Sequence, residues 1–305
     1  MKSYVFVHAH PDDETLWTGG LIATLAQRGE QVIVVTCTRG ERGEVITAPG
    51  TATENLGHLF GDHRALAAYR TSELQAALRA LGDGIEHHFL DELPLPPHRC
   101  TNREGPPGHS ARNEVETQNL IPKYQDSGMV WLVPPSIEGD DPRTSTGGVA
   151  GPDPDAAGGF ANVNLNESSG RLANYLLTMR GTGDEVRDNY GVVVVTYEAD
   201  GGYGHPDHVR THDVAVAALE LVRAQPAASG TLELWEVTKP GEPHDANLPI
   251  WPVLPQLLTA MRAYASQVQD AREDVAPGRV GWFALSNGVP LPIRDTETYR
   301  VTKIK

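Results

Sequence analysis

Two short clusters of histidine and carboxylate residues carry the strongest chemical signal in this sequence. The first is His10-Pro11-Asp12-Asp13-Glu14, and the second is His205-Pro206-Asp207-His208, far along the chain. Imidazoles and carboxylates are ligands for zinc, and two histidines with one carboxylate leave coordination positions open for substrate and water. The clusters therefore predict a hydrolytic metal site, in which the metal polarises a carbonyl group and activates water.

The segments around these clusters are typical of a parallel α/β sheet. Residues 3–9 and 31–37 are apolar and rich in β-branched side chains, as in buried strands. Between them, Trp17, Leu21 and Leu25 recur at helical spacing before Gly29, which predicts an amphipathic helix. In such sheets ligands bind beyond the carboxyl ends of the strands. Because a strand is also expected at 192–197, both clusters should lie at that edge.

The remaining pattern predicts an α/β fold with a Rossmann-like, mostly parallel sheet and helices on both faces. Helices are expected near 64–81, 168–179, 206–222 and 254–269, and strands near 86–90 and 232–237, with a final strand at 282–285. We expect one α/β domain over 1–305, with a C-terminal elaboration at 231–305. Residues 91–163 are dense in Pro and Gly, which predicts an irregular insertion forming an active-site wall or, alternatively, a partly disordered segment.

Charge and composition restrict the possible partners. The 305 residues include 25 basic and 40 acidic side chains, a formal charge of -15, which repels phosphate backbones and anionic lipid heads. We therefore expect a small-molecule substrate, with no nucleic acid and no membrane as partners. Two cysteines, Cys37 and Cys100, are too few for a disulfide framework, and no secretory leader is apparent. A cytoplasmic location is the expectation.

The string His8 to Glu14, together with Gly201-Gly202-Tyr203-Gly204 and the second cluster, resembles the signatures of the PIG-L/LmbE-like zinc de-N-acetylases. Within that family it is most similar to the branch of the mycothiol-biosynthesis N-acetylglucosaminyl-inositol deacetylases and mycothiol S-conjugate amidases. The likeness covers roughly 3–90, 124–129 and 190–222, with a weaker echo at 261–267 and 283–287. It implies hydrolysis of the N-acetyl amide of an N-acetylglucosamine glycoside.

Carried over to this sequence, the resemblance implies a role for each motif residue. His10, Asp13 and His208 match the metal ligands, for one Zn²⁺ per chain; the same ligand set also suits Fe²⁺. Asp12 matches the general base that takes a proton from the attacking water and later gives one to the leaving amine.

The resemblance extends to groups around the metal. His205 matches the residue that stabilises the tetrahedral oxyanion, Tyr203 a mobile tyrosine that donates to the same oxygen, and Asp207 the residue that orients His205 and tunes its charge. Arg70 and Asp126 match residues that grip sugar and inositol hydroxyls, and Glu44 sits in a similar place. Arg70 as a surface charge and Asp126 as a plain loop carboxylate are the alternatives.

Departures from the family pattern leave other functions open. Residues 91–123 and 130–163 have no counterpart, and Glu198-Ala199-Asp200 replaces the usual entry to the Gly-rich turn. The alternatives are an amidase acting on mycothiol S-conjugates, a deacetylase of an antibiotic-precursor sugar, and a non-enzymatic sugar-binding protein. A dinucleotide-binding module is disfavoured, because Gly19-Gly20 stand too far into the helix to cradle a pyrophosphate.

Overall fold

The computed structural model describes residues 2–51, 53–95, 122–133, 149–151, 153–155, 158–179, 191–225 and 230–304. Its main sheet has seven strands in the order β3-β2-β1-β6-β7-β12-β8. Five of them run parallel, namely β3 (Glu86–Phe89), β2 (Gln31–Thr36), β1 (Lys2–His8), β6 (Gly191–Tyr197) and β7 (Thr231–Val237). The predicted mostly parallel α/β fold is confirmed.

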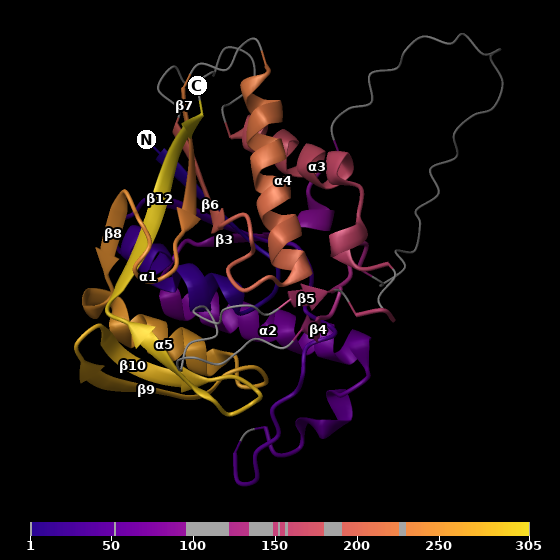
Figure 1. Ribbon diagram of the computed structural model, residues 1–305, viewed down its shortest axis with the longest axis vertical. Coiled ribbons are helices and arrows are strands. Elements are labelled where there is room, and N and C mark those ends of the chain that lie inside the picture. The colour runs from indigo at the N-terminus through magenta and orange to yellow at the C-terminus, as the bar shows by residue number, and fades with distance from the viewer. Residues whose placement is uncertain are drawn as a thin grey trace, which may run out of the picture.

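Helices cover both faces of this sheet (Figure 1). One face packs on α3 (Leu165–Thr178) and α4 (Pro206–Arg223). The opposite face packs on α1 (Asp13–Gln27), α2 (His63–Leu81) and α5 (Leu254–Ala263). Alternate side chains of β1 enter the two cores, since Val5 and Val7 face the first layer and Phe6 the second. Uninterrupted runs of β-branched residues therefore form central strands that are buried on both sides.

The order of the strands creates a crevice beside β1. From β1 the chain moves outward to β2 and β3, and it then returns to β6 on the other side of β1. Parallel sheets bind ligands at such switch points, beyond the carboxyl ends of the strands. The turns after β1 and after β6 lie there and carry the two histidine clusters.

The C-terminal part differs from the prediction in two places. The expected helix over 254–269 ends at Ala263, because Tyr264 leaves helical geometry and the backbone N–H of Ser266 donates to Glu73 on α2. The strand expected at 282–285 coincides with β10 and is not the final strand. β9 (Gln269–Ala276), β10 (Arg279–Ala284) and β11 (Pro290–Arg294) form a small antiparallel sheet. β12 (Thr296–Ile304) then enters the main sheet, antiparallel to β7 and to the edge strand β8 (Ala246–Pro249).

The predicted insertion at 91–163 is described only in part. Residues 96–121, 134–148, 152 and 156–157 lie outside the described residues, and with them much of the expected wall. The described parts include an antiparallel pair, β4 (Val130–Val133) and β5 (Val149–Gly151). Tyr124 and Phe160 are buried against each other, with ring centroids 5.6 Å apart. These parts are therefore packed into the domain.

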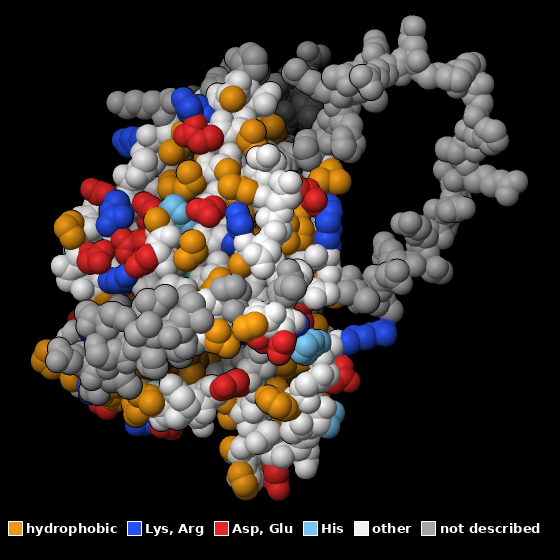
Figure 2. Space-filling model, turned by 45° about the vertical axis from the view of Figure 1, so that its right-hand side comes forward, with side chains coloured by type: hydrophobic (Ala, Val, Ile, Leu, Met, Phe, Trp, Pro, Cys, Tyr) orange, Lys and Arg blue, Asp and Glu red, His pale blue; other side chains and the backbone are white. Residues whose placement is uncertain are grey.

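Four short 3-10 helices connect these elements, at Leu56–Leu59, Leu90–Glu92, Phe160–Asn162 and Trp251–Val253 among the described residues. Within the described ranges, no helix is both long and apolar enough to cross a membrane. On the face seen in Figure 2, Lys and Arg side chains lie among Asp and Glu side chains.

Candidate active site

The two histidine clusters meet at the crevice, around the carboxylate of Asp13. Asp13 is the first residue of α1, and its Oδ2 accepts a hydrogen bond from the backbone N–H of His10 at 2.9 Å. The same oxygen lies 3.2 Å from His10 Nδ1 and 3.3 Å from His208 Nε2. All three side chains are buried. The donor atoms of His10, Asp13 and His208 lie within 4.8 Å of one another, close enough to share one metal ion.

The orientation of His208 fits a metal ligand. Its Nδ1 lies 3.1 Å from the carbonyl oxygen of Gly201, to which it can donate, and its ring stacks on Tyr197 with centroids 4.2 Å apart. That hydrogen bond places the ring proton on Nδ1 and leaves the Nε2 lone pair available. His208 Nε2 is buried and has no hydrogen-bond partner among the described residues. Such an orphaned acceptor is costly unless a cation binds it.

Glycine is required where this turn approaches His208. Gly201 has a φ of +68°, and a Cβ atom there would lie 2.7 Å from the Cβ of His208. Gly202 has a φ of +79°, and its Cβ would lie 2.3 Å from the Trp17 ring. The Gly-rich string in the second motif thus brings the backbone close enough to hold the imidazole.

A second group of possible ligands, formed by His10, His205 and Asp207, is better explained as support for the first. The buried carboxylate of Asp207 accepts hydrogen bonds from Ser127 N at 2.9 Å, Ser127 Oγ at 2.5 Å and Ala161 N at 3.0 Å. His10 Nε2 lies 3.3 Å from Asp207 Oδ2. A histidine that binds a metal through one nitrogen commonly donates its other N–H to a carboxylate in this way. Asp207 therefore orients His10.

Asp12 lies beside the candidate metal ligands in a strained backbone conformation. Its φ is 117° and its ψ is -33°, a region that non-glycine residues rarely adopt. Its Oδ2 accepts a hydrogen bond from Arg70 at 3.0 Å. Burial raises the pKa of Asp12 to about 8, although the positive charge of Arg70 opposes the shift. A carboxylate with this pKa can both accept and return a proton near neutral pH.

His205 and Tyr203 face the same cavity from the turn before α4. The backbone N–H of Asp207 donates to His205 Nδ1 at 3.1 Å, which leaves the ring proton of the neutral imidazole on Nε2. Burial, with the charges of His10 and His208, lowers the pKa of His205 well below its usual value. The expected contact of Asp207 with His205 is thus made by the backbone, while the carboxylate turns to His10. Tyr203 stacks on Trp17, with ring planes 11° apart.

The three expected substrate contacts all line the cavity, but they differ in what they already bind. Arg70 is buried and donates to the carbonyl oxygens of Gly40 at 2.6 Å and Pro11 at 2.5 Å, as well as to Asp12. Asp126 accepts from the backbone N–H groups of Gly128 and Arg42, at 2.7 and 3.2 Å. Glu44 is exposed, and its backbone carbonyl accepts from Gln267.

Sequence reasoning missed several residues that complete the site. Ser127 follows the expected Asp126 directly, and Glu14 stands within the first motif, yet neither was assigned a role. Tyr264 and Phe283 lie in the two weakly similar segments near the C-terminus. Their proximity to the site depends on how the C-terminal part packs, and adjacency to a motif was the only available signal for Ser127 and Glu14.

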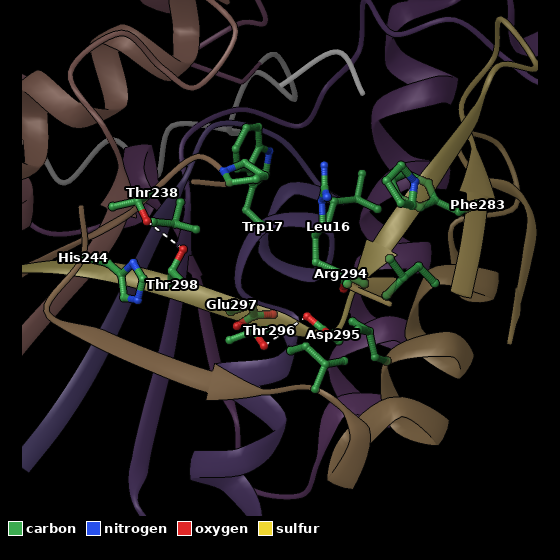
Figure 3. A pocket seen from close by; sticks show the side chains of 18 of the residues that line it. Leu16, Trp17, Thr238, His244, Phe283, Arg294, Asp295, Thr296, Glu297 and Thr298 are labelled. Atoms are coloured by element: carbon green, nitrogen blue, oxygen red, sulfur yellow. Dashed lines mark hydrogen bonds between the residues drawn. The ribbon is translucent and has the colours of Figure 1, made fainter. Parts of the chain in front are cut away.

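Two cavities share one wall. The cavity that His10 and Asp13 line has a volume of about 480 Å³, within the usual range for small-molecule sites. A second cavity of about 220 Å³ lies between α1, α5 and β12. Leu16, Trp17 and Phe283 line both cavities. Figure 3 shows the second cavity, with these three side chains along one side of it and Glu297 of β12 along the other. The larger cavity thus has an inner end at His10 and Asp13 and an outer wall built partly by the C-terminal sheet.

Two imidazoles and a carboxylate converge at the switch point of a Rossmann-like sheet, with a second carboxylate beside them, and this arrangement is typical of metal-dependent hydrolases. The profile of the PIG-L family, described as GlcNAc-PI de-N-acetylase, matches residues 5–219. The chain therefore belongs to the PIG-L family of metal-dependent de-N-acetylases.

Individual relatives agree with this family. The chain is 36% identical to 1D-myo-inositol 2-acetamido-2-deoxy-alpha-D-glucopyranoside deacetylase 1 of Saccharopolyspora erythraea, over 97% of this chain and 88% of that protein. It is 33% identical to the deacetylase of the same substrate name from Kineococcus radiotolerans, over 98% of this chain and 77% of that protein. Its fold is similar to that of N,N'-diacetylchitobiose deacetylase from Pyrococcus horikoshii, with a TM-score of 0.50 and 18% identity over 99% and 83% of the two chains.

Proposed function

We propose that this protein removes the acetyl group from N-acetylglucosaminyl-inositol, with zinc bound by His10, Asp13 and His208. The observation that carries the proposal is the convergence of these three buried side chains beside the strained Asp12. The substrate is supported by relatives that are 36% and 33% identical and are named for this glycoside. The products are acetate and the free amino sugar.

Zinc is favoured by the donor set. Two imidazoles and one carboxylate with open positions are typical of hydrolytic zinc sites, although Fe²⁺ accepts the same ligands. When bound, the metal polarises the amide carbonyl and lowers the pKa of water. The chain itself orients His10 through Asp207 and His208 through the Gly201 carbonyl.

Asp12 is the proposed general base. Its carboxylate takes a proton from the water that attacks the amide carbon, and it returns the proton to the nitrogen as the carbon–nitrogen bond breaks. The raised pKa of Asp12, caused by burial, supports the second step because it makes the protonated carboxyl persist near neutral pH. The guanidinium of Arg70 donates to this carboxylate, and both residues line the cavity.

His205 and Tyr203 are the proposed donors to the tetrahedral oxyanion. His205 Nδ1 accepts the backbone N–H of Asp207, so that its Nε2–H is left to donate. The depressed pKa of His205, caused mainly by burial, keeps the imidazole neutral. Tyr203 lines the same cavity. Donors fixed before the reaction contribute a few kcal/mol each to stabilising the transition state.

The cavity favours a neutral polyol over a phosphorylated one. Among its described lining residues, the cations with a permanent charge are Arg42 and Arg70. Arg70 is bound to Asp12, and Arg42 lies 3.5 Å from Asp153 and donates to the carbonyl oxygen of Asp155. Acidic and amide groups such as Glu44, Asp126 and Asn287 face the same cavity and suit sugar and inositol hydroxyls.

Acetate release from a substrate panel tests the proposal. The panel contains N-acetylglucosaminyl-inositol, N-acetylglucosamine and a mycothiol S-conjugate, each with zinc-loaded enzyme and metal analysis of the same sample. We expect kcat/KM for N-acetylglucosaminyl-inositol to exceed that for N-acetylglucosamine by at least about tenfold, because the inositol adds hydrogen bonds to the wall. Dominant cleavage of the conjugate would instead identify an amidase, and no turnover of any amide would leave a sugar-binding protein.

A further inference from the structure

The C-terminal part of the chain reaches the general base through a buried tyrosine and a buried glutamate. We propose that Tyr264 and Glu14 are positioning residues, which hold Asp12 in the backbone conformation that the reaction requires. The proposal deepens the proposed function and rests on it. In this proposal, the segment after α5 helps to position the general base in addition to packing against the domain.

The conformation of Asp12 needs such support. Asp12 and Asp270 are the non-glycine residues with positive φ within the described ranges, and Asp270 lies in the exposed β9 edge of the small sheet. A strained backbone persists only where its surroundings determine it from several sides, and it is concentrated at functional sites. The contacts around Asp12 therefore show what maintains the strain.

Each polar group of Asp12 has its own partner. The carbonyl oxygen accepts from Thr15 N at 3.0 Å and Leu16 N at 2.9 Å, which begins α1. The carboxylate is held by Arg70. The backbone N–H donates to Glu14 Oε2 at 3.2 Å. The first contact occurs at any helix start, and the second turns the side chain. The peptide before Asp12 is held at both of its polar groups, because Arg70 donates to the carbonyl oxygen of Pro11 at 2.5 Å and Glu14 accepts the N–H of Asp12. The contact with Glu14 is the one that connects this peptide to the C-terminal part of the chain, through Tyr264.

Glu14 is itself fixed by the C-terminal part of the chain. Its side chain is fully buried, and its Oε1 accepts from Tyr264 Oη at 2.7 Å and from Thr15 Oγ1 at 2.6 Å. Tyr264 is also fully buried and directly follows α5. Two residues later, Ser266 donates its N–H and its hydroxyl to Glu73 of α2, at 2.8 and 2.6 Å. The turn that carries Tyr264 is thus anchored independently of Glu14.

The chain contains a matched pair that contacts α1 farther from Asp12. Tyr299 is buried, and its hydroxyl donates to Glu297 Oε2 at 2.6 Å. Glu297 accepts from the backbone N–H groups of Gly20 and Leu21, at 2.7 and 2.9 Å. This pair also joins a C-terminal tyrosine through a glutamate to the backbone of α1, but in the middle of the helix, beside the second cavity (Figure 3). Removing either hydroxyl deletes the same kind of hydrogen bond.

The experiment compares Tyr264→Phe with Tyr299→Phe in the zinc-loaded enzyme. We expect similar losses of thermal stability and full metal content in both. For Tyr264→Phe we expect kcat to fall about 10- to 100-fold with little change in KM, because a small displacement of a catalytic group has effects of this size. Tyr299→Phe should keep kcat within about twofold. Equal kcat values in the two variants would show that Tyr264 is structural only.

Two further measurements keep the test decisive. If Tyr264→Phe does not fold, Glu14→Gln preserves side-chain volume and weakens the contact with the Asp12 amide; an unchanged kcat in that variant overturns the proposal. A crystal structure of either variant is a readout independent of turnover, in which the Asp12 carboxylate should be displaced, and an unmoved Asp12 also overturns it. A wild-type enzyme that releases no acetate from the panel refutes the proposed function, while the crystallographic comparison still tests the positioning.

Discussion

At the inner end of the cleft, His10, Asp13 and His208 lie in the segments that follow two neighbouring parallel strands, β1 and β6, whereas the outer wall is assembled from distant segments. The inner side chains are buried and held by several contacts each. The outer wall takes residues from 42–44, 128–129 and 283–291, and Glu44 and Asn287 are exposed. In the proposed function, the reaction therefore depends mainly on two local motifs, and specificity depends on how the rest of the chain packs. Substitutions at the two ends should then affect different kinetic quantities.

The largest expected effect is loss of the metal from the inner end. His208→Ala removes a ligand that is fully buried and stacked on Tyr197. We expect metal content near zero, a lower melting temperature, and kcat at least about 1000-fold lower, because the metal supplies several kcal/mol of transition-state stabilisation. Metal analysis, thermal melting and acetate release measure the three effects.

His212→Ala is the matched control for this change. His212 lies one turn further along α4, and its Nε2 is 3.0 Å from Glu236 instead of facing the cavity. It should retain both metal and turnover. If His208→Ala keeps its metal, the proposed ligand set is wrong. The inner end of the cleft would then not be a metal site formed by His208.

The next largest effect is expected at Asp12, where two substitutions should have similar effects on kcat and different effects on stability. Asp12→Ala and Asp12→Gly should both retain metal and lose about 100- to 10,000-fold in kcat, as expected for a general base. Glycine relieves the φ of 117°, whereas alanine does not. The glycine variant should therefore be more stable than the alanine variant by about 1 kcal/mol or more in urea unfolding. Equal stability of the two variants would argue against strain at this position.

The fold was predictable where burial is reflected in local sequence. The central strands β1, β2 and β6 are continuous apolar runs, because both of their faces are covered by helices. β9 and β12 escaped prediction since each has one side open to solvent, and charged residues interrupt their patterns. The helix expected over 254–269 extends beyond the observed end at Ala263, because Tyr264 and Val268 continue its apolar spacing. The turn at Tyr264 is stabilised by hydrogen bonds to Glu14 and Glu73, and these distant contacts cannot be predicted from the local sequence.

The inner site was predictable for a similar reason. Each histidine cluster follows a recognisable strand, and the parallel topology brings both strand ends to one edge. The directions of the long side chains were not predictable. Arg70 turns to Asp12 and two backbone carbonyls, and Asp207 turns its carboxylate to His10 and Ser127. The direction of such a side chain depends on which hydrogen-bonding partners lie nearby in the folded chain. Ser127 lies in 124–129, a short stretch that resembles the family, and the residues before and after this stretch have no counterpart there.

The smallest expected effect belongs to the outer wall. Glu44→Gln neutralises an exposed side chain. The contact of Glu44 with Gln267 is made by its backbone carbonyl, so the fold should be unaffected. We expect KM for N-acetylglucosaminyl-inositol to rise about fivefold with kcat unchanged, since one solvent-accessible hydrogen bond contributes about 1 kcal/mol. Glu273→Gln, an exposed residue of β9, is the control and should alter neither value. A fall in kcat with constant KM would mean that the wall acts on the reacting groups, and the division of labour between the two ends would then not hold.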